Sequence, residues 1–147
     1  MIAIVNGPVM SLLGEREPEK YGSSTLHDLE SHIRATFPGR EFLFYQSDCE
    51  GDLIHFLIEN RARISGVVIN PAGYTTTSIA IRDTINALQK PAVEVHLTNI
   101  YSRESFRHPS IIAPVCTGQI AGLGITGYVL AVHYIDEKTH CTERKNV

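Results

Sequence analysis

Five short runs of apolar residues stand out along this 147-residue chain. Runs of this length and composition are typical of strands that are buried on both faces of a parallel sheet. We expect strands over residues 1–5, 41–45, 66–70, 92–97 and 111–117, the last of which reads IIAPVCT. Each run is followed by a polar or glycine-containing turn, so each strand has a defined end.

Between these runs, apolar residues recur at the three- and four-residue spacing of amphipathic helices. We expect helices over residues 26–37, 50–63, 77–89 and 125–135, and a poorly ordered polar tail over 136–147. Thr25 with Asp28 resembles a capping box, and Thr76 or Thr77 is expected to cap the third helix. Strand and helix alternate throughout, which predicts an α/β fold: a doubly wound, flavodoxin-like sheet of five parallel strands in three layers, forming one domain over residues 1–147.

In that strand order the order in which strands are added to the sheet reverses between the first and third strands. Ligands of open α/β sheets bind at such a topological switch point. The turns after Asn6 and Asn70 should therefore flank a site. Residues 8–23 follow the first turn and are too long for an ordinary connection, so we interpret them as a functional lid. The lid carries Arg16 and Tyr21.

The segment after the fourth strand concentrates candidate chemistry. Period-two alternation puts Glu94 and His96 on one face of that strand. A carboxylate in this position can orient the imidazole and stabilise its charged form. The loop that follows holds Arg103 and Arg107, which could grip a carboxylate or hydroxyl groups. The alternative is an ordinary core histidine paired with a nearby glutamate.

Composition narrows the class of partner. A net charge of −3 gives no basic footprint for nucleic acid, and no apolar run is long enough to span a membrane. Cys49, Cys116 and Cys141 are odd in number and lack metal-binding spacing, which favours reduced thiols, a cytoplasmic location and no metal site. Gly122–Gly127 matches GxGxxG, but no acidic strand follows, so a tight turn is favoured over a dinucleotide site.

Arg16 and Tyr21 can be read in two ways. A guanidinium beside a phenol lowers the pKa of the phenol and can turn tyrosine into a general base. Alternatively, Arg16 pairs with Glu17 or Glu19 in a solvated turn. The presence of His96 favours the interpretation of Tyr21 as a general base. An elimination next to a carbonyl needs a base that removes the proton and an acid that protonates the leaving hydroxyl.

Several segments together resemble the type II 3-dehydroquinate dehydratase (3-dehydroquinase) family. They are NGP, LLGEREPEKYG, FYQSDCEGDLI, INPAGYTTTSIAIRD, EVHLTNIYSRESFR and TGQIAGLGITGY, and they cover about residues 2–135. The resemblance implies a hydro-lyase of shikimate biosynthesis or quinate catabolism that converts 3-dehydroquinate to 3-dehydroshikimate through an enolate. It also implies no cofactor, no metal ion, and a dodecamer of trimers.

The resemblance assigns the catalytic roles residue by residue. Tyr21 matches the family's base and Arg16 the arginine that lowers the pKa of that base. His96 matches the general acid, and Glu94 matches the carboxylate that orients it.

Other positions match substrate contacts of the family. Asn70, Leu97 and Thr98 match the positions that hold the substrate carboxylate. Arg107 matches a contact to the ring hydroxyls. Asp83 matches an acid that reaches into a neighbouring subunit's site, although its position on the third predicted helix also fits an ordinary surface charge.

Two positions depart from the family pattern. Val9 stands where the family usually has an asparagine that helps to stabilise the enolate, and Thr76 stands where it usually has a histidine that contacts a substrate hydroxyl. Arg103 is similar to a second arginine of the family with a less defined role. Because of the two departures, a diverged enzyme acting on a related polyhydroxy cyclic acid and a non-catalytic oligomer that binds a small acid are kept as alternatives.

Overall fold

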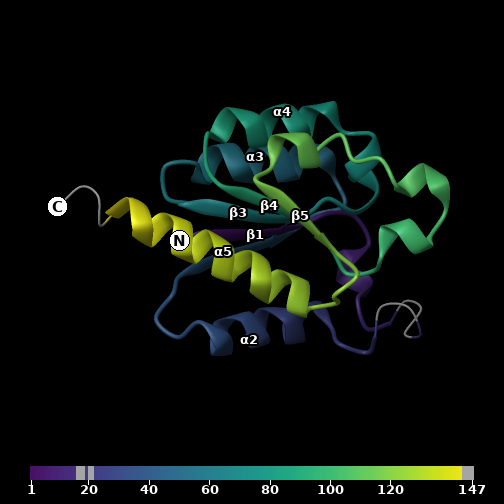
Figure 1. Cartoon of the computed structure of the whole chain (residues 1–147), viewed down its shortest axis with the longest axis horizontal. Helices are drawn as coiled ribbons and strands as arrows, with labels where there is room; N and C mark the ends of the chain where they lie inside the picture. Colours follow the sequence, from purple (N-terminus) through teal and green to yellow (C-terminus); the bar gives the residue numbers. More distant parts are fainter. Residues whose placement is uncertain (16–18, 20–21, 144–147) are drawn as a thin grey trace.

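The computed structural model describes residues 1–15, 19 and 22–143. Its centre is a parallel sheet with the strand order β2-β1-β3-β4-β5 (Figure 1). The strands are β1 (Ile2–Asn6), β2 (Phe42–Gln46), β3 (Gly66–Asn70), β4 (Ala92–His96) and β5 (Gly118–Ala121). The predicted α/β, doubly wound, flavodoxin-like fold is confirmed.

Helices cover both faces of the sheet and give the three predicted layers. On one face lie α3 (Glu50–Asn60) and α4 (Ile79–Leu88), and on the other lie α2 (Leu26–Thr36) and α5 (Thr126–Glu143) (Figure 1). No helix in the described part of the chain is long and apolar enough to cross a membrane.

Each layer contact is a hydrophobic core, because every residue of β1, β3 and β4 is buried and most of these residues are apolar. Leu29 and Ile33 of α2 pack with Tyr128 and Ile135 of α5 on one side of the sheet. A second cluster on the opposite side joins α3 to α4. Burying one such side chain stabilises the fold by about 1.5–3 kcal/mol.

The start of α2 has the predicted capping box. The backbone N–H of Thr25 donates to Asp28 at 2.8 Å, and the backbone N–H of Asp28 donates to the Thr25 hydroxyl at 3.1 Å. The bond from the Thr25 backbone, and then the bond from its hydroxyl, hold the pKa of the Asp28 carboxyl below its ordinary value. This helix begins where the sequence predicts.

The predicted fifth strand, residues 111–117, is wrong. Ala113–Val115 form the short 3-10 helix η5, and the strand that pairs with β4 begins at Gly118. The Ser110 hydroxyl accepts the backbone N–H groups of Ile112 and Ala113 at 3.1 and 2.8 Å, which coils the segment. Pro114 has no N–H to donate to a ladder, so the apolar run cannot pair as a central strand.

Several helix boundaries also differ from the prediction, and α3 ends at Asn60 rather than at residue 63. Ser78, rather than Thr76 or Thr77, caps α4: its hydroxyl accepts the backbone N–H of Ile81 at 2.8 Å. The final helix does not end at residue 135, because α5 continues to Glu143. Beyond Ile135 it packs less deeply, with an Arg40–Asp136 ion pair and Lys138 over the Tyr134 ring. Residues 144–147 lie outside the described part.

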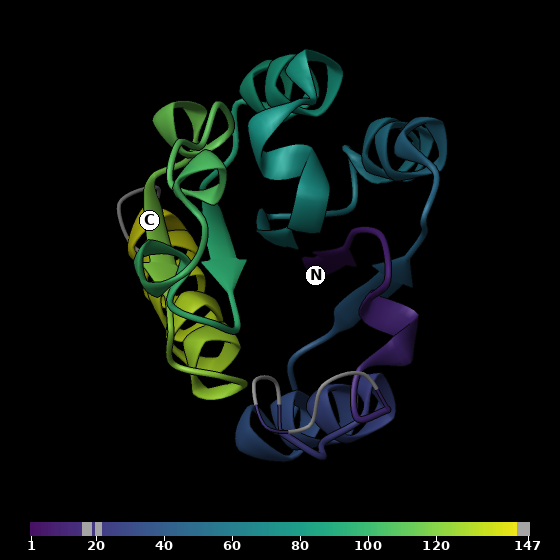
Figure 2. The ribbon, with the colours of Figure 1, turned by 90° about the vertical axis from the view of Figure 1, so that its right-hand side faces the viewer.

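Short 3-10 helices gather where the carboxyl ends of the strands meet (Figure 2). They are η1 (Met10–Leu12) after β1, η2 (Ala72–Thr76) after β3, and η3 (Ile100–Ser102) and η4 (Ser105–Arg107) after β4. This is the edge of an open α/β sheet at which ligands bind.

Candidate active site

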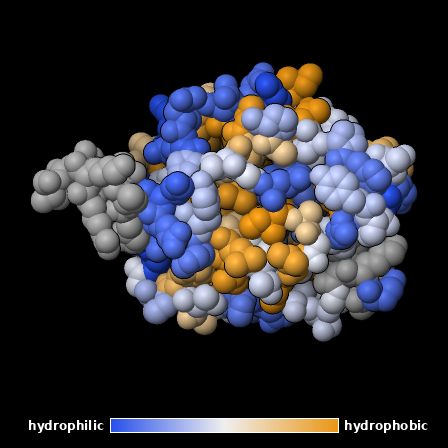
Figure 3. Space-filling model, in the orientation of Figure 1, coloured by the Kyte–Doolittle hydropathy of each residue, from blue (hydrophilic) through white to orange (hydrophobic). Residues whose placement is uncertain are grey.

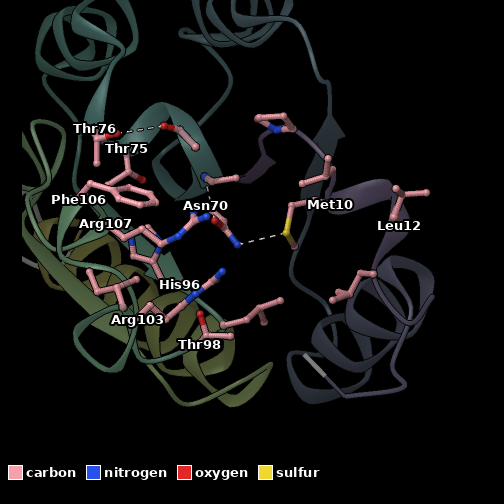
Figure 4. Close-up of a pocket in the computed structure, with 17 residues that line it drawn as sticks. Met10, Leu12, Asn70, Thr75, Thr76, His96, Thr98, Arg103, Phe106 and Arg107 are labelled. Carbon is pink, nitrogen blue, oxygen red and sulfur yellow. Dashed lines mark hydrogen bonds between the residues drawn. The ribbon is translucent and has the colours of Figure 1, made fainter. Parts of the chain in front are cut away.

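A pocket opens at this edge, and the segments after β1, β3 and β4 line it. Figure 4 shows Asn70, His96, Arg103 and Arg107 on one side of the space and Met10 and Leu12 on the other. Most of the predicted substrate-contact positions lie on its wall, as does the departing valine: Val9, Asn70, Thr76, Leu97, Thr98, Arg103 and Arg107.

His96 and Glu94 form a buried pair at the end of β4. Nε2 of His96 lies 2.5 Å from Oε1 of Glu94, and the glutamate is fully buried while the histidine keeps 7% of its surface exposed. The alternation of side chains along β4 places both on one face, as predicted. His96 also lines the pocket, so the pair joins the core of the protein to the cavity.

Two residues that the sequence analysis missed complete the surroundings of Glu94. The Ser110 hydroxyl donates to Oε2 at 2.7 Å, and Nε2 of Gln119 donates to Oε1 at 3.0 Å. A buried carboxylate is tolerated only when such donors replace water. Glu94 is therefore fixed from three directions and can hold the His96 ring in one orientation.

The two arginines share one carboxylate at the pocket rim. Nε of Arg107 lies 2.8 Å from Oε2 of Glu104, and Nε of Arg103 lies 3.6 Å from the same oxygen. The Glu104 backbone N–H, and then Arg107, hold the pKa of the Glu104 carboxyl below its ordinary value. Glu104 is thus kept as an anion that orients both guanidinium groups, and these groups suit an anionic or hydroxylated ligand.

Asn70 presents a buried amide to the pocket. Its Oδ1 accepts the backbone N–H of Ala72 at 3.1 Å, which fixes the side chain. Its Nδ2 lies 3.4 Å from Sδ of Met10, and a thioether is only a weak acceptor. A ligand carboxylate would be a much better partner for this N–H group.

One predicted residue, Asp83, is not among the residues that line this cavity. Asp83 lies on α4 with its side chain 64% exposed and 2.9 Å from Nη1 of Arg82. Arg16 and Tyr21 lie outside the described residues. The segment after β3 that meets the pocket is η2, not the start of α4.

Gly122 and Gly124 form the tight turn favoured for the GxGxxG segment. Both have positive φ angles, 90° and 56°, and a Cβ on Gly122 would lie 3.0 Å from Cβ of Asn99. Gly127 packs against Ile120 and Val95 at the start of α5. The three glycines are explained by turn geometry and close packing.

Among the described residues, neither the possible metal ligands nor the thiol of Cys116 supports catalysis. Within the described part of the chain, no group of three or more His, Cys, Asp or Glu residues could hold a metal ion. Burial, and then the negative charge of Glu94, raise the pKa of the Cys116 thiol to about 12. Because the thiolate is the nucleophile, Cys116 is unsuited to covalent catalysis at neutral pH.

The raised pKa of Cys116 makes a prediction about its rate of thiol–disulfide exchange. In the variant Cys49→Ser with Cys141→Ser, the remaining Cys116 should react at pH 8 about a thousandfold more slowly in the folded protein than in denaturant. The expected rate can be followed with a chromogenic disulfide reagent. Equal rates in the two states would show that Cys116 is neither shielded nor held as a thiol.

Residues 1–136 match the model of the family described as Dehydroquinase class II. The chain belongs to the class II dehydroquinase family. The recognition made from sequence motifs is therefore confirmed.

Individual relatives of this class II dehydroquinase agree in sequence and in fold. It is 50% identical over 133 residues to the 3-dehydroquinate dehydratase of Chlorobaculum tepidum, covering 89% of this chain and 90% of the relative. It is 48% identical over 141 residues to that of Bacillus subtilis, covering 90% of each. The crystal structure of the type II dehydroquinase from Butyrivibrio crossotus superposes with a TM-score of 0.88 at 38% identity, covering 92% of this chain and 96% of the other.

Proposed function

We propose that this chain, a type II 3-dehydroquinate dehydratase by family and by relatives, uses His96 as the acid that expels water. The enzyme is a hydro-lyase that converts 3-dehydroquinate to 3-dehydroshikimate. The observation that carries the proposed role is the buried His96–Glu94 pair that opens onto the pocket. Because Nε2 is hydrogen-bonded to Glu94, Nδ1 is the ring nitrogen that would protonate the leaving hydroxyl.

The elimination proceeds in two proton transfers. Tyr21, as a phenolate stabilised by Arg16, takes the proton next to the substrate carbonyl, and the electron pair left behind forms an enolate. The enolate then collapses, the carbon–oxygen bond on the neighbouring carbon breaks, and the hydroxyl leaves as water with the proton from His96. The roles of Tyr21 and Arg16 rest on the family resemblance. The lid over residues 8–23 stays a prediction.

The pocket wall supports the proposed substrate contacts. Asn70 with Leu97 and Thr98 would hold the substrate carboxylate, while Arg107 and Thr76 would contact ring hydroxyls. Electrostatic contacts of this kind orient the substrate so that the leaving hydroxyl meets His96. No cofactor is needed for this chemistry, because acid and base are both supplied by side chains.

We also propose that the chain acts as one catalytic domain within a dodecamer of trimers in the cytoplasm. Asp83 would then contribute to a neighbouring subunit's site, which fits its exposure away from the pocket of its own chain. Hydrophobic side chains lie at the surface on the side of β5 and α5 (Figure 3). Leu123 and Leu130 of this region are 53% and 45% exposed, and such surfaces are typical of subunit contacts.

One specific feature favours a second candidate, an enzyme for a related polyhydroxy cyclic acid. Val9 and Thr76 both line the pocket, and they occupy the two positions at which the family pattern has an asparagine and a histidine. A substrate that lacks a partner for one of those groups would be better matched to this pocket.

The direct test is ultraviolet absorbance of a 3-dehydroquinate solution after addition of the purified protein. The product carries a conjugated enone and the substrate does not, so a steady rise in absorbance is expected. A flat trace from folded protein would contradict turnover of this substrate. Calorimetric titration with 3-dehydroquinate would then separate a binding protein from an enzyme with another substrate.

A further inference from the structure

We propose that Asp48 is a positioning residue that fixes one wall of the pocket without touching the substrate. This inference rests on the proposed function, because it concerns how the pocket is held in shape for the dehydration. The wall is the segment Gly7–Leu13, which leads from β1 into η1 and contributes Val9, Met10 and Leu12 to the pocket.

The wall contains a backbone conformation that its own sequence disfavours. Val9 has φ 61° and ψ 4°, in the left-handed region, although it is β-branched. Bulky residues are outliers there and persist only when the surrounding structure holds them. Val9 is also 43% exposed, so burial of its side chain does little to hold the turn.

Asp48 supplies the contact that holds this turn. The backbone N–H of Val9 donates to Oδ1 of Asp48 at 2.8 Å. Nε2 of Gln46 donates to the same oxygen at 3.0 Å and to the carbonyl oxygen of Gly7 at 3.3 Å. The side chains of Gln46, the last residue of β2, and of Asp48, just after it, thus hold the turn after β1 by hydrogen bonds to Gly7 and Val9.

The same residue also connects to the segment after β3. The Tyr74 hydroxyl donates to the main-chain carbonyl oxygen of Asp48 at 2.7 Å. The turn itself abuts β3, since the Gly7 N–H donates to the Asn70 carbonyl oxygen at 2.8 Å and a Cβ on Gly7 would lie 2.6 Å from the Pro71 oxygen. Asp48 therefore ties together the three segments that end β1, β2 and β3.

This arrangement predicts an effect on the pocket rather than on the core. The Asp48 side chain is exposed and is not among the residues that line the cavity, so its removal leaves no cavity in the core. What is lost is the acceptor that holds Val9, and the wall with Met10 lies across the pocket from His96 and Arg107 (Figure 4). A small displacement of such a wall is enough to impair catalysis.

The test compares Asp48→Ala with Asp48→Asn. Alanine should lower kcat/KM for 3-dehydroquinate at least tenfold while the thermal midpoint changes by no more than about 2 °C. Asparagine keeps a side-chain oxygen that can accept both donors and should stay within about threefold of the wild type. Glu59→Ala, which removes an exposed acid of α3, serves as the matched control and should leave kcat/KM unchanged.

A second measurement does not depend on turnover. Amide hydrogen exchange over residues 8–15 should be at least tenfold faster in Asp48→Ala than in the wild type and unchanged in Asp48→Asn. Unchanged kcat/KM or unchanged exchange in Asp48→Ala, or an asparagine variant as impaired as alanine, would overturn the proposal. A wild type that does not turn over 3-dehydroquinate would overturn the proposed function instead, and the exchange result would still decide the role of Asp48.

Discussion

Replacing His96 with alanine is expected to lower kcat on 3-dehydroquinate about a thousandfold. Alanine cannot protonate the departing hydroxyl, so the leaving group would have to depart as hydroxide or take its proton from water. The measurement is the initial rate of absorbance increase at saturating substrate. Binding should weaken far less than turnover, because the asparagine and arginines of the pocket remain.

Controls separate chemistry from folding. Loss of His96 leaves Glu94 buried with one donor fewer, which can destabilise the protein. His96→Gln offers an amide N–H to Glu94 but no acid, so it should fold and remain as slow as the alanine variant. His55→Ala, which removes an exposed histidine of α3, should keep full activity. Substantial turnover by either His96 variant would refute the role of His96 as the acid. The Tyr21→Phe variant tests the base: it should bind the substrate but not turn it over.

Replacing Val9 with asparagine together with Thr76 with histidine is expected to raise kcat on 3-dehydroquinate about a hundredfold. Both positions line the pocket. The Thr76 hydroxyl makes only a long contact of 3.5 Å with the Gly73 carbonyl oxygen, so its replacement breaks no strong bond. The two changes restore polar groups that can stabilise the enolate and bind a hydroxyl.

The structure adds a second expectation for the first of these positions. Asparagine tolerates the left-handed conformation that valine resists, so Val9→Asn should raise the free energy of unfolding by about 1 kcal/mol. Val9→Gly is the matched control, because it relieves the same backbone strain but adds no polar group, and it should gain stability without gaining rate. An unchanged kcat in the double variant would favour the alternative of a different cyclic acid substrate.

The parts of the fold that could be predicted are those governed by local patterns. The strands β1 to β4 are short runs of mostly apolar residues, so their positions follow from composition to within one residue. β5 could not be found in the same way, because Gly118–Ala121 is a short edge strand that is only partly buried. The stronger apolar signal just before it belongs to residues that Ser110 coils into η5.

In the candidate site, too, contacts within one strand could be predicted and contacts between strands could not. Glu94 and His96 are two residues apart on one strand, so alternation alone places them together. Gln119 meets Glu94 only because β4 and β5 pair in a register that sets these two residues opposite each other. The contact between Asp48 and Val9 likewise spans 39 residues and depends on β2 lying beside β1. Contacts set by strand order cannot be predicted from spacing.

The strand order also has a consequence for directed evolution of this enzyme. The segments after the three central strands line the pocket, whereas two of the residues that support it come from the two edge strands, Asp48 after β2 and Gln119 on β5. A mutant library restricted to Asp48 and Gln119 would sample new shapes of the pocket while the identity of every substrate-contacting residue is unchanged. Variants with altered turnover and retained selectivity should therefore be enriched at the margins of the sheet.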